Sequence, residues 1–208
     1  VEVIYNGYDS DDFPISSDKL GQHFTITHIG SMNDDRNPTQ LWRALGELRR
    51  EHKGFSHDLQ IEFYGLTDFE VFEHLEKNGL KNKTQNHGFL PHCEMTTLLS
   101  TKAILLLSQN RTDNVMGIIP GKLFEYLASK RPILTIGHPD GDCNQILKKT
   151  GAFSAIDFDD ADKMKTRVLE LYQHFKNGTL TNRQYQVNQF DRKELTRQMC
   201  EHLNQLIV

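Results

Sequence analysis

The chain has 208 residues, of which 24 are Lys or Arg and 28 are Asp or Glu, giving a formal net charge of -4. This length suits one large domain, and 37% hydrophobic with 25% charged residues is typical of a soluble globular protein. The acidic balance argues against a surface built mainly to hold nucleic acid, and no apolar run approaches the roughly 18 residues that a membrane span needs.

The cysteines and histidines do not form a recognisable metal-binding pattern. Cys93, Cys143 and Cys200 are odd in number and far apart, which disfavours a disulfide framework and favours a reducing, cytoplasmic setting. His87 and His92 lie near Cys93 but lack the paired spacing of zinc ligands. We therefore expect no metal site.

Strands and helices are expected to alternate along the first half of the chain. The β-branched and apolar run 24–29 predicts a strand that stops at Gly30, and Asn37 is expected to cap a helix that covers 38–51. After these, the patterns predict a strand at 59–64, a helix at 69–80 and a short strand at 85–89.

The second half continues the same rhythm. The predicted elements are a helix at 91–100, a buried strand at 103–107, a helix at 121–129, a strand at 132–136, and helices at 144–149 and 159–175. The tail 191–207 has apolar residues at three- and four-residue intervals, which predicts an amphipathic helix that packs on the domain.

Alternating strands and helices require crossover connections, which are nearly always right-handed and produce a parallel sheet covered on both faces. The sequence therefore predicts an α/β, Rossmann-like three-layer sandwich with a parallel sheet of about six strands. We expect an entry segment at 1–22, the Rossmann-like domain at 23–190 and the terminal helix at 191–208.

Ligands of open parallel sheets bind outside the carboxyl ends of the strands, so the loop after the first strand is informative. It lacks the G-x-G-x-x-G pattern, which disfavours an NAD or FAD cofactor. Gly30 gives a turn without a side chain, and Arg36 stands before a helix, where a guanidinium can pair with a phosphate. The alternative is a solvated arginine beside two aspartates.

The segment 114–134 carries the strongest local pattern. Its predicted helix follows Gly121, whose amide, together with Lys122 in the first turn, would favour an anionic diphosphate. Glu125 lies one turn further and can accept hydrogen bonds from sugar hydroxyls. The alternative is an ordinary amphipathic helix with Lys122 and Glu125 exposed.

The segment 117–134 resembles the donor-binding signature of glycosyltransferase family 4, in which a Glu-x7-Glu stretch leads into a strand. The segment 3–9, V-I-Y-N-G-Y-D, is similar to the linker that enters the second domain of these two-domain, GT-B enzymes. The resemblance implies that this chain is the C-terminal, nucleotide-sugar-binding part of such an enzyme, and that an N-terminal domain precedes it.

The resemblance also implies roles for particular residues. Glu125 matches the second glutamate, which implies that it accepts from the nucleotide ribose, whereas Gly117 stands at the first glutamate. Ser31 replaces an arginine often found in the phosphate loop, which leaves Arg36 as the candidate diphosphate cation. The segment 87–91 is similar to the loop that packs the base, which implies that role for Phe89 and Leu90.

The implied reaction moves a sugar from a nucleotide diphosphate sugar to a saccharide or lipid-linked acceptor, with retention of configuration and without a metal cofactor. The acceptor would bind the absent N-terminal domain, which would also supply the catalytic group, so this chain alone is expected to be inactive. The full-length enzyme would be cytoplasmic or peripheral to the inner membrane. A nonenzymatic Rossmann module that binds a nucleotide or a protein partner, and half of a nucleotide-sugar epimerase, are the alternatives.

Overall fold

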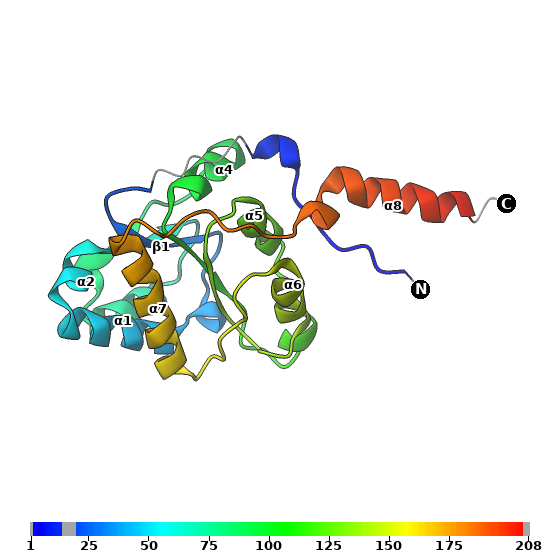
Figure 1. Cartoon of the computed structure of the whole chain (residues 1–208). Helices are drawn as coiled ribbons and strands as arrows, with labels where there is room; N and C mark the ends of the chain where they lie inside the picture. Colours follow the sequence, from blue (N-terminus) through cyan, green and yellow to red (C-terminus); the bar gives the residue numbers. More distant parts are fainter. Residues whose placement is uncertain (1, 14–19, 206–208) are drawn as a thin grey trace.

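The computed structural model describes residues 2–13 and 20–205, and Figure 1 shows their arrangement. Residues 1 and 14–19 of the predicted entry segment, and 206–208 of the predicted terminal helix, lie outside the described residues. Among the described helices, none combines the length and the apolar character that crossing a bilayer requires.

A parallel sheet forms the centre of the molecule. Its strands are β1 (Phe24–Ile29), β2 (Leu59–Tyr64), β3 (Thr84–Asn86), β4 (Ile104–Ser108) and β5 (Ile133–Ile136), in the spatial order β3-β2-β1-β4-β5. β1 pairs with β2 from Phe24 opposite Leu59 to Ile29 opposite Tyr64. The order reverses at β1, which places the switch point of the sheet between β1 and β4.

The helices cover both faces of this sheet (Figure 1). One apolar cluster packs α1 (Thr39–Glu51), α2 (Lys53–Asp58), α3 (Phe69–Lys77) and α7 (Ala161–Lys176) against the sheet. A second cluster packs α4 (His92–Thr101), α5 (Lys122–Ala128) and α6 (Asp142–Thr150) on the opposite face. The predicted three-layer, Rossmann-like sandwich is confirmed.

The sheet differs from the prediction in the number and length of its strands. Five strands are present among the described residues, whereas about six were predicted. The segment after α6 makes a single parallel bridge, between Ile136 and Ile156, which is too short to count as a strand. β3 ends at Asn86 because Gly88 adopts a φ of 68°, which leaves the extended region.

The start of α1 also differs from the prediction. Asn37 was expected to cap this helix, but its side-chain oxygen accepts a hydrogen bond of 2.7 Å from the indole of Trp42. Pro38 occupies the capping position without a side-chain hydrogen bond. The buried Trp42 indole therefore takes the acceptor that the sequence pattern assigned to the helix backbone, since a buried N–H requires a partner.

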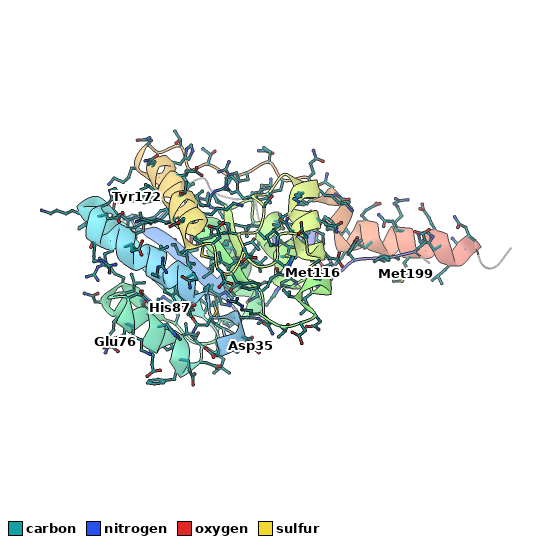
Figure 2. The ribbon with its side chains drawn as sticks, turned by 90° about the horizontal axis from the view of Figure 1, so that it is seen from below. Asp35, Glu76, His87, Met116, Tyr172 and Met199 are labelled. Atoms are coloured by element: carbon teal, nitrogen blue, oxygen red, sulfur yellow. The ribbon has the colours of Figure 1, made fainter. Side chains whose placement is uncertain are left out.

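The terminal helix α8 (Arg192–Gln205) projects from the body of the domain, as Figure 1 shows. Leu195 is its only buried residue among those described, and Met199 lies half exposed beyond the body of the domain (Figure 2). The sequence predicted a helix packed on the domain, but the helix packs only through its first turns. Apolar residues at intervals of three and four lie on one face of a helix, but this spacing does not determine what that face contacts.

Candidate functional site

The carboxyl ends of β1 and β2 meet through two glycines. Gly30 and Gly65 follow these strands with φ of 100° and 130°, conformations that L side chains rarely adopt. A Cβ on Gly65 would lie 2.5 Å from the carbonyl oxygen of Gly30. The two turns can approach this closely because neither residue has a side chain.

Lys122, at the start of α5, reaches across to the end of β1. Its Nζ donates to the carbonyl oxygen of Ile29 at 2.9 Å and lies 3.1 Å from Nε2 of His28. A Cβ on Gly30 would meet the same Nζ at 3.2 Å. The ammonium therefore lies in the angle between the end of β1 and the glycine turn, one of the places where the sequence predicted a phosphate.

The surroundings of Lys122 disfavour its charge. Burial lowers the pKa of Lys122 to about 7, and the positive charge of Arg36 acts in the same direction, while Glu125 opposes it. The protonated form of such a lysine is strongly stabilised by a nearby anion, because an opposite charge offsets the loss of hydration. The position is thus one where an anionic group would be stabilised.

His28 is the buried partner of this lysine. Its Nδ1 lies 3.1 Å from the carbonyl oxygen of Leu106, and its Nε2 lies 3.2 Å from the carbonyl oxygen of Ser31 and 3.1 Å from Nζ of Lys122. A proton on Nδ1 would donate to Leu106 and leave Nε2 to accept from the lysine. Burial, together with the charge of Lys122, lowers the pKa of His28 to about 3. His28 is therefore a neutral hydrogen-bond acceptor that orients the lysine.

Arg36 is held at the rim of the same loop. One guanidinium nitrogen donates to the carbonyl oxygen and to the hydroxyl of Ser31, each at 3.1 Å, and Nε donates to the side chain of Asn110 after β4. Ser108 in turn donates to the backbone carbonyl of Arg36 at 2.6 Å. The structure thus brings Ser31, Arg36 and Lys122 together at the switch point.

Glu125 lies one turn after Lys122, with its side chain 23% exposed. Its Oε1 lies 3.2 Å from Nε2 of His92, the first residue of α4. Among the described residues no second hydrogen bond to this carboxylate is found. Gly121 precedes α5, where a Cβ would approach Asn6 of the entry segment at 3.4 Å.

The remaining predicted site residues lie around this centre. Phe89 and Leu90 follow β3, on a loop joined to the end of β2 by the hydrogen bond from Gly65 N–H to Gly88. Phe89 is 87% exposed, whereas Leu90 is half-buried. Gly117 ends a short 3-10 turn, η4 (Val115–Gly117), and faces open space.

Two positioning residues were not identified from the sequence. His28 is the one ionisable side chain in β1 and stands just before the end of the strand, and that was the available signal. Gln109 follows β4, donates to the carbonyl oxygen of Ile118 at 3.0 Å and accepts from the N–H of His138 at 3.2 Å. It ties the loop that carries Gly117 to the loop after β5.

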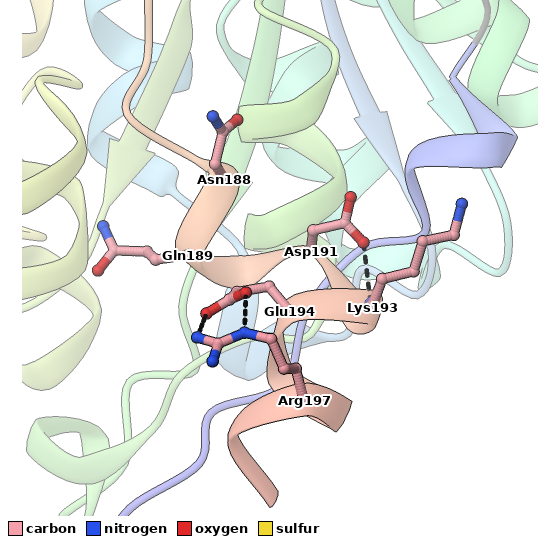
Figure 3. A pocket seen from close by; sticks show the side chains of 6 residues that line it. All are labelled: Asn188, Gln189, Asp191, Lys193, Glu194 and Arg197. Carbon is pink, nitrogen blue, oxygen red and sulfur yellow. Dashed lines mark hydrogen bonds and ion pairs between the residues drawn. The ribbon is translucent and has the colours of Figure 1, made fainter. Parts of the chain in front are cut away.

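A separate hollow on the described surface lies away from this centre. Figure 3 shows this open space of about 620 Å³ at the start of α8, lined by Asn188, Gln189, Asp191, Lys193, Glu194 and Arg197. Its charges are satisfied locally, since Arg197 pairs with Glu194 at 2.6 Å and Lys193 with Asp11 at 2.7 Å. None of its lining residues comes from a loop at a strand end.

Across the described ranges, no group of three or more His, Cys, Asp or Glu side chains gathers in a way that suits a metal ion. The expectation of a metal-free site is not tested by this arrangement and stays a prediction.

Comparisons with known proteins identify the fold. No protein-family model matches the chain, and no curated protein matches it in sequence. Its structure is similar to HepE from Anabaena, solved with UDP-glucose, with a TM-score of 0.73 and 14% identity over 98% of this chain and 57% of that one. Sucrose-phosphate synthase from Thermosynechococcus elongatus gives 0.69 and 13% identity over 99% and 52%.

A third similar structure defines which part of these proteins the chain matches. The C-terminal domain of a glycosyl transferase group 1 family protein, LpcC from Francisella tularensis, gives a TM-score of 0.60 and 13% identity over 93% of this chain and 98% of that domain. Of the larger glycosyltransferase chains, this chain spans between 32% and 57%. The chain therefore has the fold of the C-terminal domain of GT-B glycosyltransferases.

Proposed function

We propose that the chain is the nucleotide-sugar-binding domain of a glycosyltransferase. The observation that carries this proposal is the convergence of Arg36, Lys122 and Glu125 at the switch point of the sheet, in the fold of a GT-B C-terminal domain. Two cations and one carboxylate suit the two polar parts of a nucleoside diphosphate, its phosphates and its ribose.

The diphosphate would lie between Arg36 and Lys122. The guanidinium of Arg36 is already oriented by Ser31 and Asn110, so little conformational freedom is lost when it pairs with a phosphate oxygen. Lys122 is partly desolvated, and an approaching phosphate would favour its protonated form. In a transfer reaction the same two cations would stabilise the negative charge that develops on the leaving diphosphate.

The nucleoside would extend from the phosphates toward α5 and the loop after β3. Glu125 has a carboxylate oxygen available to accept from the ribose hydroxyls. Phe89 offers an exposed aromatic ring and Leu90 an apolar edge on which a base can pack. Gly121 and Gly117 would allow the backbone to approach the ligand closely.

In the whole enzyme, the bond between the anomeric carbon and the diphosphate breaks, and a new bond forms from that carbon to an acceptor hydroxyl, which loses its proton. We assign the acceptor, a saccharide or lipid-linked sugar, and the catalytic group to a second domain outside this chain. We further propose that the reaction retains anomeric configuration, needs no metal, and occurs at the cytoplasmic side, and that this chain alone binds the nucleotide without transferring sugar.

A nonenzymatic nucleotide-binding module is favoured by one observation. Gly117 faces open space where the related signature places a carboxylate, so the contact expected with the transferred sugar has no side chain. Such a module would bind the nucleoside diphosphate, and an attached sugar would not increase its affinity.

Calorimetric titration with UDP, GDP and ADP tests the proposal. We expect one of them to bind saturably, with at least tenfold weaker binding by Arg36→Ala and by Glu125→Ala. Arg43→Ala and Glu76→Ala, which remove exposed members of surface ion pairs, are matched controls and should leave binding unchanged. Absence of binding by the wild-type chain would overturn the proposal, as would binding that neither site variant weakens.

A further inference from the structure

His92 joins three segments that are distant in the sequence. Its Nε2 lies 3.2 Å from Oε1 of Glu125 on α5, and its Nδ1 lies 3.9 Å from Oδ2 of Asp12. Asp12 belongs to the 3-10 turn η1 (Ser10–Asp12) of the entry segment, which Asp9 caps through the N–H of Asp11. The imidazole therefore stands between the entry segment and the carboxylate that would bind ribose.

We propose that His92 is a positioning residue for nucleotide recognition: it holds Glu125 for the ribose and connects that carboxylate to the entry segment through Asp12. This inference rests on the proposed function, because it assigns Glu125 to the ribose. His92 itself acts through Glu125 and makes no contact with the phosphates or the base.

The contact fixes one oxygen of Glu125 and leaves the other available. A glutamate side chain has several rotamers of similar energy, and ordering it on ligand binding costs free energy. A hydrogen bond from His92 to Oε1 orders it beforehand and directs Oε2 to accept from a hydroxyl. The helix α4 starts at His92 after Pro91, so the backbone that carries the imidazole is also fixed.

The exposure of the three side chains determines how much the loss of these contacts should change ligand affinity. His92 is 56% exposed, Asp12 43% and Glu125 23%, so water screens both contacts. Exposed ion pairs contribute little, and their loss corresponds to about a two- to fivefold change in affinity. Loss of Glu125 itself should cost more, because the ligand then loses its acceptor.

The entry segment is held from its other side by α8. Lys193 pairs with Asp11, the neighbour of Asp12, at 2.7 Å. A row of polar contacts thus runs from α8 through the 3-10 turn to His92 and Glu125. Movement of the entry segment relative to α4 would therefore change how Glu125 is held, which makes the affinity for ribose sensitive to the position of this segment.

A double-mutant cycle on the full chain tests the proposal. The ligands are whichever of UDP, GDP and ADP binds most tightly, and its 2′,3′-dideoxy analogue, which lacks the ribose hydroxyls. We expect His92→Ala to weaken binding of the ribonucleotide about two- to fivefold and to leave the dideoxy analogue and the Glu125→Ala background unaffected. His92→Gln, which keeps an N–H donor near the position of Nε2, should restore affinity.

Two further variants complete the experiment. Asp12→Asn should weaken ribonucleotide binding about twofold at most, because its contact is the longer one. His52→Ala removes an exposed histidine at the far end of α1 and should change nothing. An equal loss for both ligands after His92→Ala would overturn the positioning role while leaving nucleotide binding intact, and absence of binding by the wild-type chain would overturn both proposals.

Discussion

Lys122 donates to the backbone of Ile29 at the end of β1, while Nε2 of the buried His28 lies 3.1 Å from its Nζ. The ammonium is thus directed into the sheet edge and away from bulk water. This relationship makes the protonation of one lysine depend on the folded structure, which has a measurable consequence for stability.

We predict that Lys122 makes stability rise with pH above neutrality. In the unfolded chain this lysine has its ordinary pKa of 10.5, whereas burial lowers the pKa to about 7 in the folded chain. Between these values the unfolded state binds more protons, so the free energy of unfolding increases with pH across that window. Urea unfolding between pH 7 and 10 should show this rise in the wild type relative to Lys122→Met.

The control for this experiment is Lys148→Met, which removes an exposed lysine from α6 and so accounts for the loss of one charge. If the wild type and Lys122→Met ran parallel from pH 7 to 10, the lysine would be solvated in solution and its inward orientation would be wrong.

The strands and helices were predictable where local pattern and tertiary environment agree. β1 has the predicted bounds because a β-branched, fully buried run ends at a glycine. α2 was not predicted, since Lys53–Asp58 contains Gly54 and lacks a repeated apolar stripe. Its buried Phe55 owes its helical turn to packing against Tyr172 and Phe24, which the local sequence does not contain.

The candidate site was predictable only in part, for a related reason. Residues that follow strands, such as Ser31, Arg36 and Phe89, can be placed at one edge of the sheet from topology alone. The contact between His92 and Glu125 joins residues 33 positions apart, and no periodicity or motif encodes it. Contacts of this kind depend on how α4 and α5 pack on the same face of the sheet.

Gly65 should be intolerant of any side chain. In Gly65→Ala the new Cβ would lie 2.5 Å from the carbonyl oxygen of Gly30, at a φ of 130° that alanine disfavours. Strain and overpacking together predict a loss of about 2–4 kcal/mol in the free energy of unfolding.

Gly151 provides the matched control for Gly65, because its φ is 77° and a Cβ there would meet open space. Gly151→Ala should therefore lower the free energy of unfolding only by the backbone strain of alanine at this φ, about 1 kcal/mol. Chemical denaturation measures the loss of unfolding free energy in both variants. Equal losses would show that a Cβ on Gly65 lies farther than 2.5 Å from the carbonyl oxygen of Gly30.

Lys130→Gly should stabilise the domain. Lys130 follows α5 with a φ of 60°, in the left-handed region where glycine is usual after a helix. Removing the Cβ relieves backbone strain in the folded state, while glycine adds conformational freedom to the unfolded chain. The net expected increase in the free energy of unfolding is about 0.5–1 kcal/mol. Lys130→Ala keeps the Cβ and loses the charge, so thermal denaturation should show a higher midpoint for the glycine variant alone. A gain shared by both variants would instead assign the effect to the lost charge.

Gly117→Glu tests whether the open position in the donor signature is compatible with a carboxylate. A Cβ there meets nothing within 4 Å and the residue is exposed, so the free energy of unfolding should change by less than about 0.5 kcal/mol. The new carboxylate would lie on the short turn before α5, where the resemblance places a contact with the transferred sugar.

The expected result for Gly117→Glu is tighter binding of the nucleotide sugar relative to the nucleotide diphosphate, measured by calorimetry with both ligands. Gly21→Glu adds the same charge at another open position, on the segment that precedes β1, and should leave the ratio of the two affinities unchanged. A carboxylate at 117 that repels both ligands equally would place the sugar elsewhere and favour the nonenzymatic module, because only a donor site distinguishes the sugar from the diphosphate that carries it.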